Sequence, residues 1–514
     1  MSRRNGGIIG PTNTPVGGFV AGVAGGVWRM NDVLTFVSNS QWPKTPENIE
    51  NALRFDDDSN DYLNATLGTG GNSKTFTVSF WFKLGLVPSG NSMNTIGTGV
   101  DNTNDFMIGF SYDSSRTTGI HILARNGSST RVIDVQTNKK FRDLSAWYHA
   151  VIAIDTTQST SSDRVKIYIN GSQETSLLTS TYPDQDTELR WNSANIHYVG
   201  TTRDNQTSAT YDGYFAEVVN VDGQALTPSS FGETNTASGI WTPKKIGQIA
   251  NAGPNSFYLN FKDSSNLGKD QSGNGHNFTV NNLTSIDQST DTCVVNYATL
   301  NPLYHYSGAA SFSEGNLKFT TSGNSSVGRG MSTIRPESGK WYVECKIIDV
   351  TRFQIGIMNG NETNNTQGGS DSNSVILGYG GDFYFNATVY SSYISAPSNN
   401  DIVQLALDLD NDLFWFGVND TWGNSATRTE IENGTATNSG STDIGSQVPV
   451  NTGAIGIFVE DNSGTGNNVC EMNFGNPPFT ISSGNSDANG FGNFEYAVPS
   501  GYYALNTTNL NTYG

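Results

Sequence analysis

The sequence predicts an all-β protein of two antiparallel β-sandwiches in tandem, preceded by an extended N-terminal arm. Residues 147–171, WYHAVIAIDTTQSTSSDRVKIYING, show two strands and a turn, because Val165, Ile167 and Ile169 alternate with polar residues after an aromatic run. Residues 403–420, VQLALDLDNDLFWFGVND, repeat that pattern around a short acidic turn. The 57 glycines and the 15% share of charged residues suit short strands and tight turns rather than helices. Two such hairpins, far apart in the chain, predict two β-domains in series.

Length and charge narrow the classes of function. With 514 residues the chain can form two large all-β domains, or about three domains of ordinary size. The 28 basic residues against 47 acidic ones give a net charge of -19, which would repel a nucleic-acid backbone. A run of about 18 apolar residues is absent from the sequence, so we expect no membrane-spanning helix.

The cysteines and histidines follow no metal-binding or disulfide pattern. Cys293, Cys345 and Cys470 are far apart, with neither zinc spacing nor a disulfide framework. Cys345 and Cys470 lie in alternating apolar segments, so we expect them to be buried as small hydrophobic residues. Scattered core or surface positions are expected for the five histidines, which are His121, His149, His197, His276 and His305.

Residues 1–45 are rich in glycine and proline and predict an extended arm that cannot fold alone. Arg3 and Arg4 before an apolar stretch of small residues resemble a signal peptide. Proline and glycine interrupt that stretch, so we expect a retained anchoring segment. Trp28 and Trp42 would be the buried anchors if the arm docks on a partner. The alternative is that both rings fold back on the first domain.

Residues 46–232 contain the first series of alternating strands. In KTFTVSFWFK, the side chains of Phe76, Val78, Phe80 and Phe82 share one face. The motifs FTVSFWFK, WYHAVIAID, VKIYING and YDGYFAEVVNVDGQALTP resemble the laminin-G-like, concanavalin A-like jelly roll. The resemblance implies a lectin-type sandwich, whose members often bind glycans, some of them through calcium.

Residues 233–302 form a bridging segment with extra strands. The piece DQSGNGHN at residues 270–277 looks like the opening turn of another laminin-G-like unit, without a complete second copy. The segment either supplies strands to the first domain or forms a small bridge, and both arrangements fit the sequence.

Residues 303–475 carry the second series of strands, and residues 476–514 form a C-terminal tail. GKWYVECKI followed by LALDLDNDLFWFGVN is similar to the SPRY family, a β-sandwich that recognises proteins or ligands. The Asn-Gly turn that is usual in that family is replaced here by NDTW, residues 419–422.

The complete layout resembles the tail-fibre-type virion proteins of bacteriophages. It joins an RRNGGIIG arm, an SGNGHNFTVNNL bridge and a GYYALNTTNL ending to the two sandwiches. The resemblance implies a non-enzymatic structural protein on the outer surface of the virion, a homotrimer, anchored to other virion proteins by its arm. A glycan or protein of the host surface would be its ligand. The alternative is a head-decoration or tail-assembly protein that binds no receptor.

A glycosidase on such a sandwich needs two carboxylates at a fixed separation across the sugar. Glucanases of the concanavalin A-like fold carry a Glu-x-Asp-x-x-Glu strand, and EVVNVD at residues 217–222 lacks the paired acids. The sequence has neither a nucleophile elbow nor a phosphate-binding glycine loop. We therefore expect a protein that is not an enzyme. A polysaccharide-degrading enzyme is the alternative, and it would depend on one essential acid.

Calcium (Ca²⁺) is the one cofactor that the sequence suggests, because hard cations need clustered oxygen ligands. Asp56, Asp57, Asp58 and Asp61 form the best cluster, at the rim of the lectin-like sandwich, although a solvated loop would have the same composition. The run DLDND at residues 408–412 imitates the start of an EF-hand loop but lacks the glycine that such a loop needs. We predict a solvated hairpin turn there.

Sugar binding usually combines an aromatic ring with amide and carboxylate groups from loops. The densest such neighbourhood is YGGDFYFNATVYSSY, residues 379–393, with a tryptophan in a nearby loop by analogy with the SPRY family. The candidate ligand-binding residues are Asp382, Tyr384, Asn386, Tyr390, Tyr393 and Trp422. The alternative is that these rings pack between the sheets.

Overall fold

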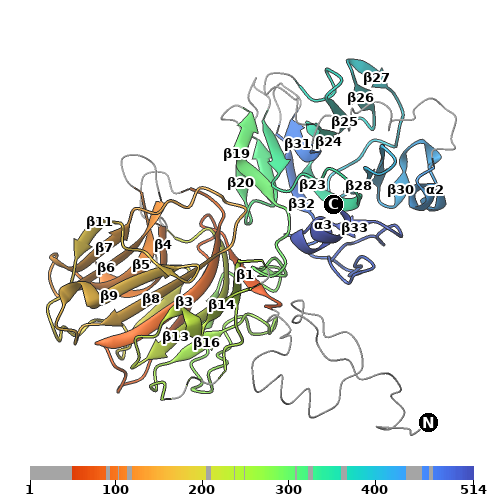
Figure 1. Ribbon diagram of the computed structural model, residues 1–514. Coiled ribbons are helices and arrows are strands. Elements are labelled where there is room, and N and C mark those ends of the chain that lie inside the picture. Colours follow the sequence, from red (N-terminus) through yellow and green to blue (C-terminus); the bar gives the residue numbers. More distant parts are fainter. Residues whose placement is uncertain are drawn as a thin grey trace, which may run out of the picture.

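The computed structural model shows two β-sandwiches that follow one another along the chain (Figure 1). It describes residues 49–87, 93–101, 103–112, 118–203, 210–236, 238–247, 249, 251–306, 310–321, 328–359, 367–435, 454–461 and 467–514. The predicted arm, with Trp28 and Trp42, lies outside these residues. The sheets are antiparallel apart from one short parallel pairing, which confirms the predicted all-β fold.

The first sandwich consists of two large sheets. In hydrogen-bonding order, one sheet contains β10 (Ser172–Gln173), β9 (Val165–Ile169), β8 (Tyr148–Asp155), β3 (Thr75–Leu84), β13 (Gly213–Asp222), β1 (Ala52–Phe55) and β18 (Gln288–Ser289), with β16 (Phe257–Leu259) also on β13. The other contains β11 (Leu177–Thr181), β7 (Arg131–Thr137), β6 (Thr118–Asn126), β5 (Asn104–Tyr112), β4 (Met93–Asp101), β12 (Ile196–Val199), β2 (Tyr62–Thr66) and β17 (Thr279–Asn281). A separate hairpin joins β14 (Gly232–Thr234) to β15 (Trp241–Pro243).

Alternating side chains of β3 fill the first core as predicted. Phe76, Val78, Phe80 and Phe82 are fully buried, and the Phe76 ring meets the Phe106 ring of the opposite sheet at a centroid distance of 5.5 Å. Burying a side chain of this size contributes about 1.5–3 kcal/mol. The predicted hairpin at 147–171 is confirmed as β8 and β9, which pair antiparallel.

The segment that follows the lectin-like motifs supplies strands to the first sandwich. Within residues 233–302, β16 pairs with β13, β17 pairs with β2 and β18 pairs with β1. The question that the sequence left open is thus answered for these three strands. They extend the first sandwich rather than forming a separate bridge.

The second sandwich also has two sheets. One contains β19 (Leu300–Tyr306), β22 (Arg329–Ser332), β31 (Gly456–Asp461), β24 (Phe353–Met358), β25 (Ser374–Gly378), β26 (Phe383–Phe385) and β27 (Thr388–Tyr390). The other contains β20 (Ala310–Ser313), β21 (Lys318–Thr321), β32 (Val469–Asn473), β23 (Lys340–Asp349), β28 (Ile402–Asp408), β29 (Leu413–Val418) and β30 (Thr421–Trp422), with β33 (Tyr503–Ala504) parallel to β23. The predicted hairpin at 403–420 is confirmed as β28 and β29. Cys345 and Cys470 are fully buried in this core, as expected.

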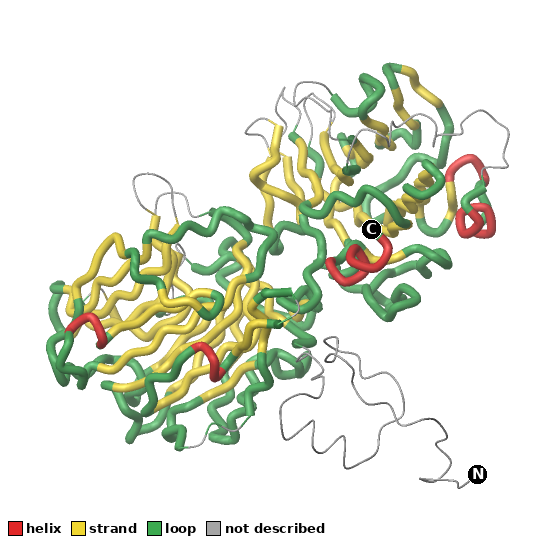
Figure 2. The backbone as a smooth tube through the Cα atoms, in the orientation of Figure 1, coloured by secondary structure: helices red, strands yellow, loops and turns green. Residues whose placement is uncertain are grey.

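Helices are few and short in the described part of the chain (Figure 2). They are α2 (Arg428–Asn433), α3 (Thr507–Tyr513) and the 3-10 turns η1 (Ser161–Asp163), η2 (Pro228–Ser230) and η3 (Gly423–Ser425). With six and seven residues, α2 and α3 are far too short to span a bilayer, and no other described helix is longer. The C-terminal tail docks on the second sandwich through β33.

Polar groups join the two sandwiches. The Lys83 ammonium of β3 lies 2.8 Å from Asp291 Oδ2, in the segment between β18 and β19 that leads from the first sandwich to the second, and both side chains are buried. Asn316 Nδ2, in the loop between β20 and β21, donates to the carbonyl of Gly85 at 2.6 Å. The Tyr214 hydroxyl of β13 donates to the carbonyl of Gly315 at 2.9 Å. The loop between β20 and β21 therefore reaches from the second sandwich onto the end of β1 and β13.

Candidate functional site

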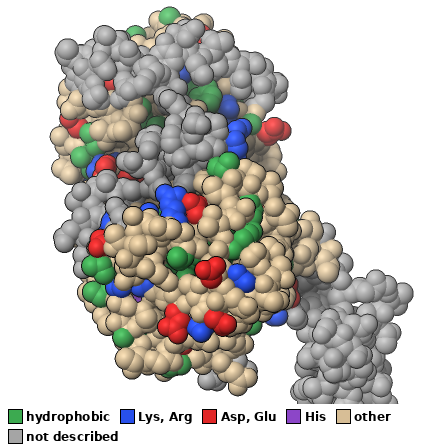
Figure 3. Space-filling view, turned by 90° about the vertical axis from the view of Figure 1, so that its left-hand side faces the viewer, with side chains coloured by type: hydrophobic (Ala, Val, Ile, Leu, Met, Phe, Trp, Pro, Cys, Tyr) green, Lys and Arg blue, Asp and Glu red, His purple; other side chains and the backbone are tan. Residues whose placement is uncertain are grey.

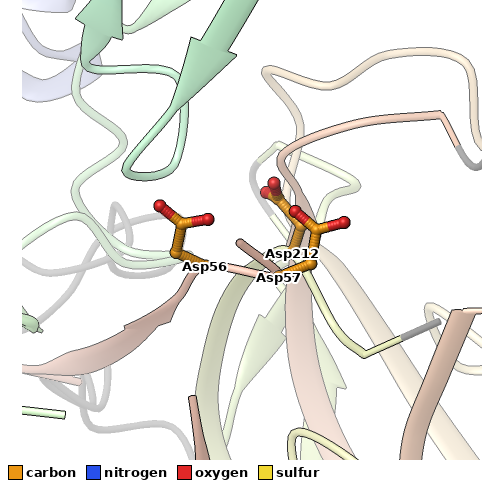
Figure 4. A group of neighbouring side chains, drawn as sticks. All are labelled: Asp56, Asp57 and Asp212. Carbon is orange, nitrogen blue, oxygen red and sulfur yellow. The ribbon is translucent and has the colours of Figure 1, made fainter. Parts of the chain in front are cut away.

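Three carboxylates meet at the end of β1. Asp56 and Asp57 follow this strand directly, and Asp212 precedes β13 directly. Phe55 lies opposite Gly213 in the antiparallel ladder, so the residues after β1 are brought beside those before β13. Each aspartate offers one carboxylate oxygen, and the three oxygens lie within 4.8 Å of one another. Figure 4 shows the three carboxylates pointing to the same side of the strand end. We call this group the Asp56–Asp57–Asp212 cluster.

Burial makes charge in this cluster costly. Asp212 is 3% exposed and Asp56 is 6% exposed, and Asp57 is half-buried. Asp212 Oδ1 has no hydrogen-bond partner in the described part of the structure. Burial, followed by repulsion from Asp57, Asp56 and Asp58, raises the pKa of Asp212 well above its ordinary value. Burial and the neighbouring carboxylates also raise the pKa of Asp57.

The predicted calcium ligands separate into two groups. Asp56 and Asp57 belong to the cluster, whereas Asp58 is exposed and its backbone N–H donates to Asp56 Oδ1 at 3.0 Å. Asp61 accepts a hydrogen bond from the Asp56 backbone N–H at 3.1 Å, and burial raises its pKa to about 7. Sequence reasoning missed Asp212. The sequence does show an acidic residue just before the strand that became β13. Recognising it as a ligand would have required knowing that β13 pairs with β1.

The acidic run at residues 408–412 forms the predicted solvated turn. Asp410 and Asp412 are exposed in the turn between β28 and β29. Asp408 is buried at the end of β28, where it pairs with the Lys340 ammonium at 2.7 Å and caps the turn through the Asn411 backbone N–H at 3.1 Å.

The predicted sugar-binding residues of the second sandwich are divided between an edge hairpin and the core. Tyr384 of β26 lies opposite Val389 of β27, and Asn386 is exposed in the turn between these strands. The Tyr390 ring stacks on Phe383 with a centroid distance of 4.8 Å. Asp382 accepts a hydrogen bond from the Ser392 backbone N–H at 2.9 Å.

Two of the predicted rings offer no face to a ligand. Tyr393 is 5% exposed within the second core, where its hydroxyl accepts the Phe416 backbone N–H at 3.3 Å. Trp422 is 6% exposed and lies in β30 rather than in a loop. Gly417 pairs with Trp422 across the β29–β30 ladder, and its missing side chain leaves room for the indole. The expected platform therefore does not include these two rings, because Tyr393 packs within the second core and pairing of β30 with β29 buries Trp422.

The acids of the EVVNVD strand are used inside the protein. Glu217 lies in a bulge of β13 with φ 52°, and its carboxylate accepts the Tyr258 hydroxyl at 2.5 Å. Asp222 is fully buried and accepts backbone N–H groups of Asn72 and Asn255 at 2.7 and 3.1 Å. These contacts hold the loop residues Asn72 and Asn255 and the strand residue Tyr258 against β13.

A pocket of about 240 Å³ lies on the outer side of β13. Apolar side chains of Val219, Val221, Ile246 and Ile249 line one part of it. Tyr258 and several hydroxyl and amide groups line the rest, among them Ser256, Ser272, Gln271 and Asn274. Gln271 and Asn274 are exposed. The pocket thus combines apolar surface with hydrogen-bonding groups.

Part of the first sandwich matches a known protein family. Residues 57–230 match a laminin-G-type family described as the concanavalin A-like lectin/glucanases superfamily. This match confirms the resemblance of the first sandwich to that family. No curated protein matches the sequence.

Partial matches to solved structures include a SPRY domain, a putative carbohydrate-binding protein and a domain of an arabinanase. The SPRY domain of human HERC1 is 16% identical, with 34% of this chain and 96% of that chain covered and a TM-score of 0.26. A putative carbohydrate-binding protein from Bacteroides ovatus is also 16% identical, with 46% and 60% covered and a TM-score of 0.31. Domain 4 of an extracellular arabinanase from Geobacillus stearothermophilus, in complex with arabinotriose, is 22% identical, with 31% and 65% covered and a TM-score of 0.22.

Proposed function

We propose that this chain is a non-enzymatic virion protein of the tail-fibre type, whose first sandwich binds a glycan of the host surface. The observation that carries the glycan part is the match of residues 57–230 to the concanavalin A-like lectin family. The virion part, with a homotrimer anchored by residues 1–45, rests on the layout of the sequence. Placement on the outer surface of the virion is part of the same proposal.

The surface charge supports an uncharged ligand. On the face shown in Figure 3, acidic and basic side chains stand singly or side by side among uncharged groups, without a large patch of one sign in the described residues. A neutral sugar needs directed hydrogen bonds and an apolar face for its ring rather than a charged patch. The pocket beside β13 provides both kinds of group, and its volume of about 240 Å³ suits a single sugar unit. We therefore place the glycan there.

Hydrolysis is not part of the proposal, because of where the perturbed carboxylates lie. Asp57 and Asp212 approach each other, yet Asp212 is only 3% exposed. A sugar bond flanked by both carboxylates would need open space between them.

Glycan binding is tested with an array of bacterial surface polysaccharides. The variant Ala252→Tyr places a ring in the pocket without removing any side-chain hydrogen bond, so we expect it to abolish binding. The matched control is Tyr379→Ala, which removes an exposed ring near the β26–β27 hairpin of the second sandwich. Loss of binding in the control alone would move the site to that hairpin.

The virion role is tested by adsorption competition. Purified protein is added to host cells before the phage, and unadsorbed virions are counted. We expect the wild-type chain to reduce adsorption and Ala252→Tyr to have no effect. Unchanged adsorption with folded wild-type protein would favour the decoration or assembly role instead.

A further inference from the structure

The Asp56–Asp57–Asp212 cluster lies at the junction of the two sandwiches. The Glu314 backbone N–H, in the loop between β20 and β21, donates to Asp56 Oδ2 at 3.3 Å. The Glu314 carboxylate lies 3.4 Å from Arg54 Nε of β1. Three consecutive residues of this loop, Glu314, Gly315 and Asn316, have φ values of 52°, 60° and 66°. The loop therefore turns tightly over the end of β1 and holds its backbone against the carboxylates.

No ion pair with a basic side chain is seen at the cluster in the described residues, although attraction to Asp56 is one of the causes that raise the pKa of Arg54. The groups that shift the pKa of Asp212 are burial and three carboxylates, with no basic side chain among them. The Arg54 guanidinium is directed instead at Glu314 and Asp287, each at 3.4 Å. Asp212 Oδ1 has no partner in the described residues although its side chain is almost completely buried. The Asp212 side chain lies within hydrogen-bond reach of Asp57, and two buried carboxylates this close are costly unless they share a proton or bind a cation.

We infer that Asp56, Asp57 and Asp212 bind a hard divalent cation, with calcium preferred, and that this ion fixes the second sandwich against the first. The ligand oxygens lie within 4.8 Å of one another. Calcium accepts about six to eight oxygen ligands in a flexible geometry, whereas magnesium requires a near-octahedral arrangement and keeps several waters. Water and backbone carbonyls would complete the coordination. Asp56 connects the ion to the second sandwich, because it belongs to the cluster and its Oδ2 accepts the Glu314 backbone N–H.

Close packing around Asp212 favours a defined site. A side chain at Gly85 would collide with Asp212 Oδ1, since its Cβ would lie 1.7 Å from that oxygen. The Asp212 carbonyl accepts the Gly85 backbone N–H at 3.1 Å. Gly85 also accepts Asn316 Nδ2 from the second sandwich. Gly85 therefore packs against the Asp212 carboxylate and also binds the loop between β20 and β21.

Terbium luminescence tests the site in the full chain. Terbium occupies calcium sites and is excited through nearby rings, here Tyr211 and Tyr214. We expect one saturable site, displaced by calcium and much less by magnesium, and a loss of affinity of about tenfold or more in Asp212→Asn. Asp58→Asn is the matched control from the same loop and should bind as the wild type does. If Asp212→Asn does not fold, Asp57→Asn replaces it.

The outcomes separate the alternatives. Absence of saturable binding in the wild type would show that Asp57 and Asp212 share a proton instead, and would overturn the site. Equal losses in Asp58→Asn and Asp212→Asn would assign the ion to the exposed loop and would also overturn it. Calcium should slow hydrogen exchange in residues 313–317, and unchanged exchange there would overturn the role at the junction. None of these measurements involves a glycan, so the cation site and the proposed function can fail independently.

Discussion

Two buried carboxylates, Glu460 in the second sandwich and Asp212 in the first, are neutralised differently. In the second sandwich, Glu460 is fully buried and its Oε2 lies 2.8 and 2.6 Å from Arg329 Nε and Nη2. Its Oε1 accepts the Gly368 backbone N–H at 2.8 Å. In the first sandwich, Asp212 is buried beside two further aspartates without a basic partner.

This difference separates a purely structural carboxylate from one that depends on solution conditions. The Glu460 charge is compensated by a residue of the same fold, so its environment is complete in the folded chain. The Asp212 charge is compensated only by a proton or a bound cation. Stability of the first sandwich should therefore respond to divalent cations, whereas the Arg329–Glu460 pair should not.

The largest effect is expected when the pair in the second sandwich is broken. Arg329→Met leaves Glu460 buried without its partner and should lower the free energy of unfolding by about 3–5 kcal/mol. Urea denaturation measures this loss. The double variant Arg329→Met/Glu460→Gln should recover part of it, because no uncompensated charge remains. A single-variant loss below about 1 kcal/mol would show that the pair is not as buried as described.

The cation should stabilise the first sandwich by a smaller amount. At a calcium concentration one hundred times Kd, the wild type should gain about 2.7 kcal/mol relative to protein in EDTA. Asp212→Asn should gain about 1.4 kcal/mol or less at the same concentration, because it lacks a charged ligand and its affinity falls about tenfold or more. In EDTA at neutral pH the variant should be at least as stable as the wild type, since it buries no ionisable acid. Urea midpoints with and without calcium give the comparison.

The pH dependence has a definite sign. Burial raises the pKa of Asp61 to about 7 and that of Glu344 to about 7. Between pH about 4 and 7 the folded chain keeps protons that the unfolded chain has released, so stability in EDTA falls as pH rises. Each group contributes up to about 1.4 kcal/mol per pH unit. Asp61→Asn should flatten this slope, and the exposed Asp58→Asn should not. A steeper slope in Asp61→Asn would contradict the assignment.

The smallest effect is expected at the surface. Lys262 Nζ lies 2.6 Å from Glu50 Oε2, but the side chains are 61% and 48% exposed. Lys262→Ala should change the free energy of unfolding by less than about 1 kcal/mol. A larger change would mean that exposed pairs matter here as much as buried ones, and the contrast between the sandwiches would lose its basis.

Local patterns gave the strands and hairpins, whereas contacts between distant segments had to come from the structure. The alternation of Val165, Ile167 and Ile169 is a property of one strand, so the sequence sufficed to place it in a hairpin. The cluster depends on the pairing of Phe55 with Gly213, which local periodicity cannot show.

The candidate binding residues divide in the same way. Asp56 and Asp57 were found because they are adjacent in the sequence, and Asp212 was missed because it is distant. Trp422 follows a turn in the sequence, but pairing of β30 with β29 buries its ring. The pocket beside β13 was also missed, since its walls come from β13, from β16 and from two loops after β15.

Calorimetric titration of calcium into cation-free protein, in two buffers with different heats of ionisation, tests the central contrast most directly. Binding of one calcium ion per chain should release protons at mildly acid pH, because burial and the neighbouring carboxylates raise the pKa of Asp212 and the ion displaces its proton. The release should disappear in Asp212→Asn and persist in Arg329→Met, if that variant remains folded. Calcium binding without proton release, or no binding at all, would contradict the claim that the first sandwich leaves its buried carboxylates to be neutralised from solution.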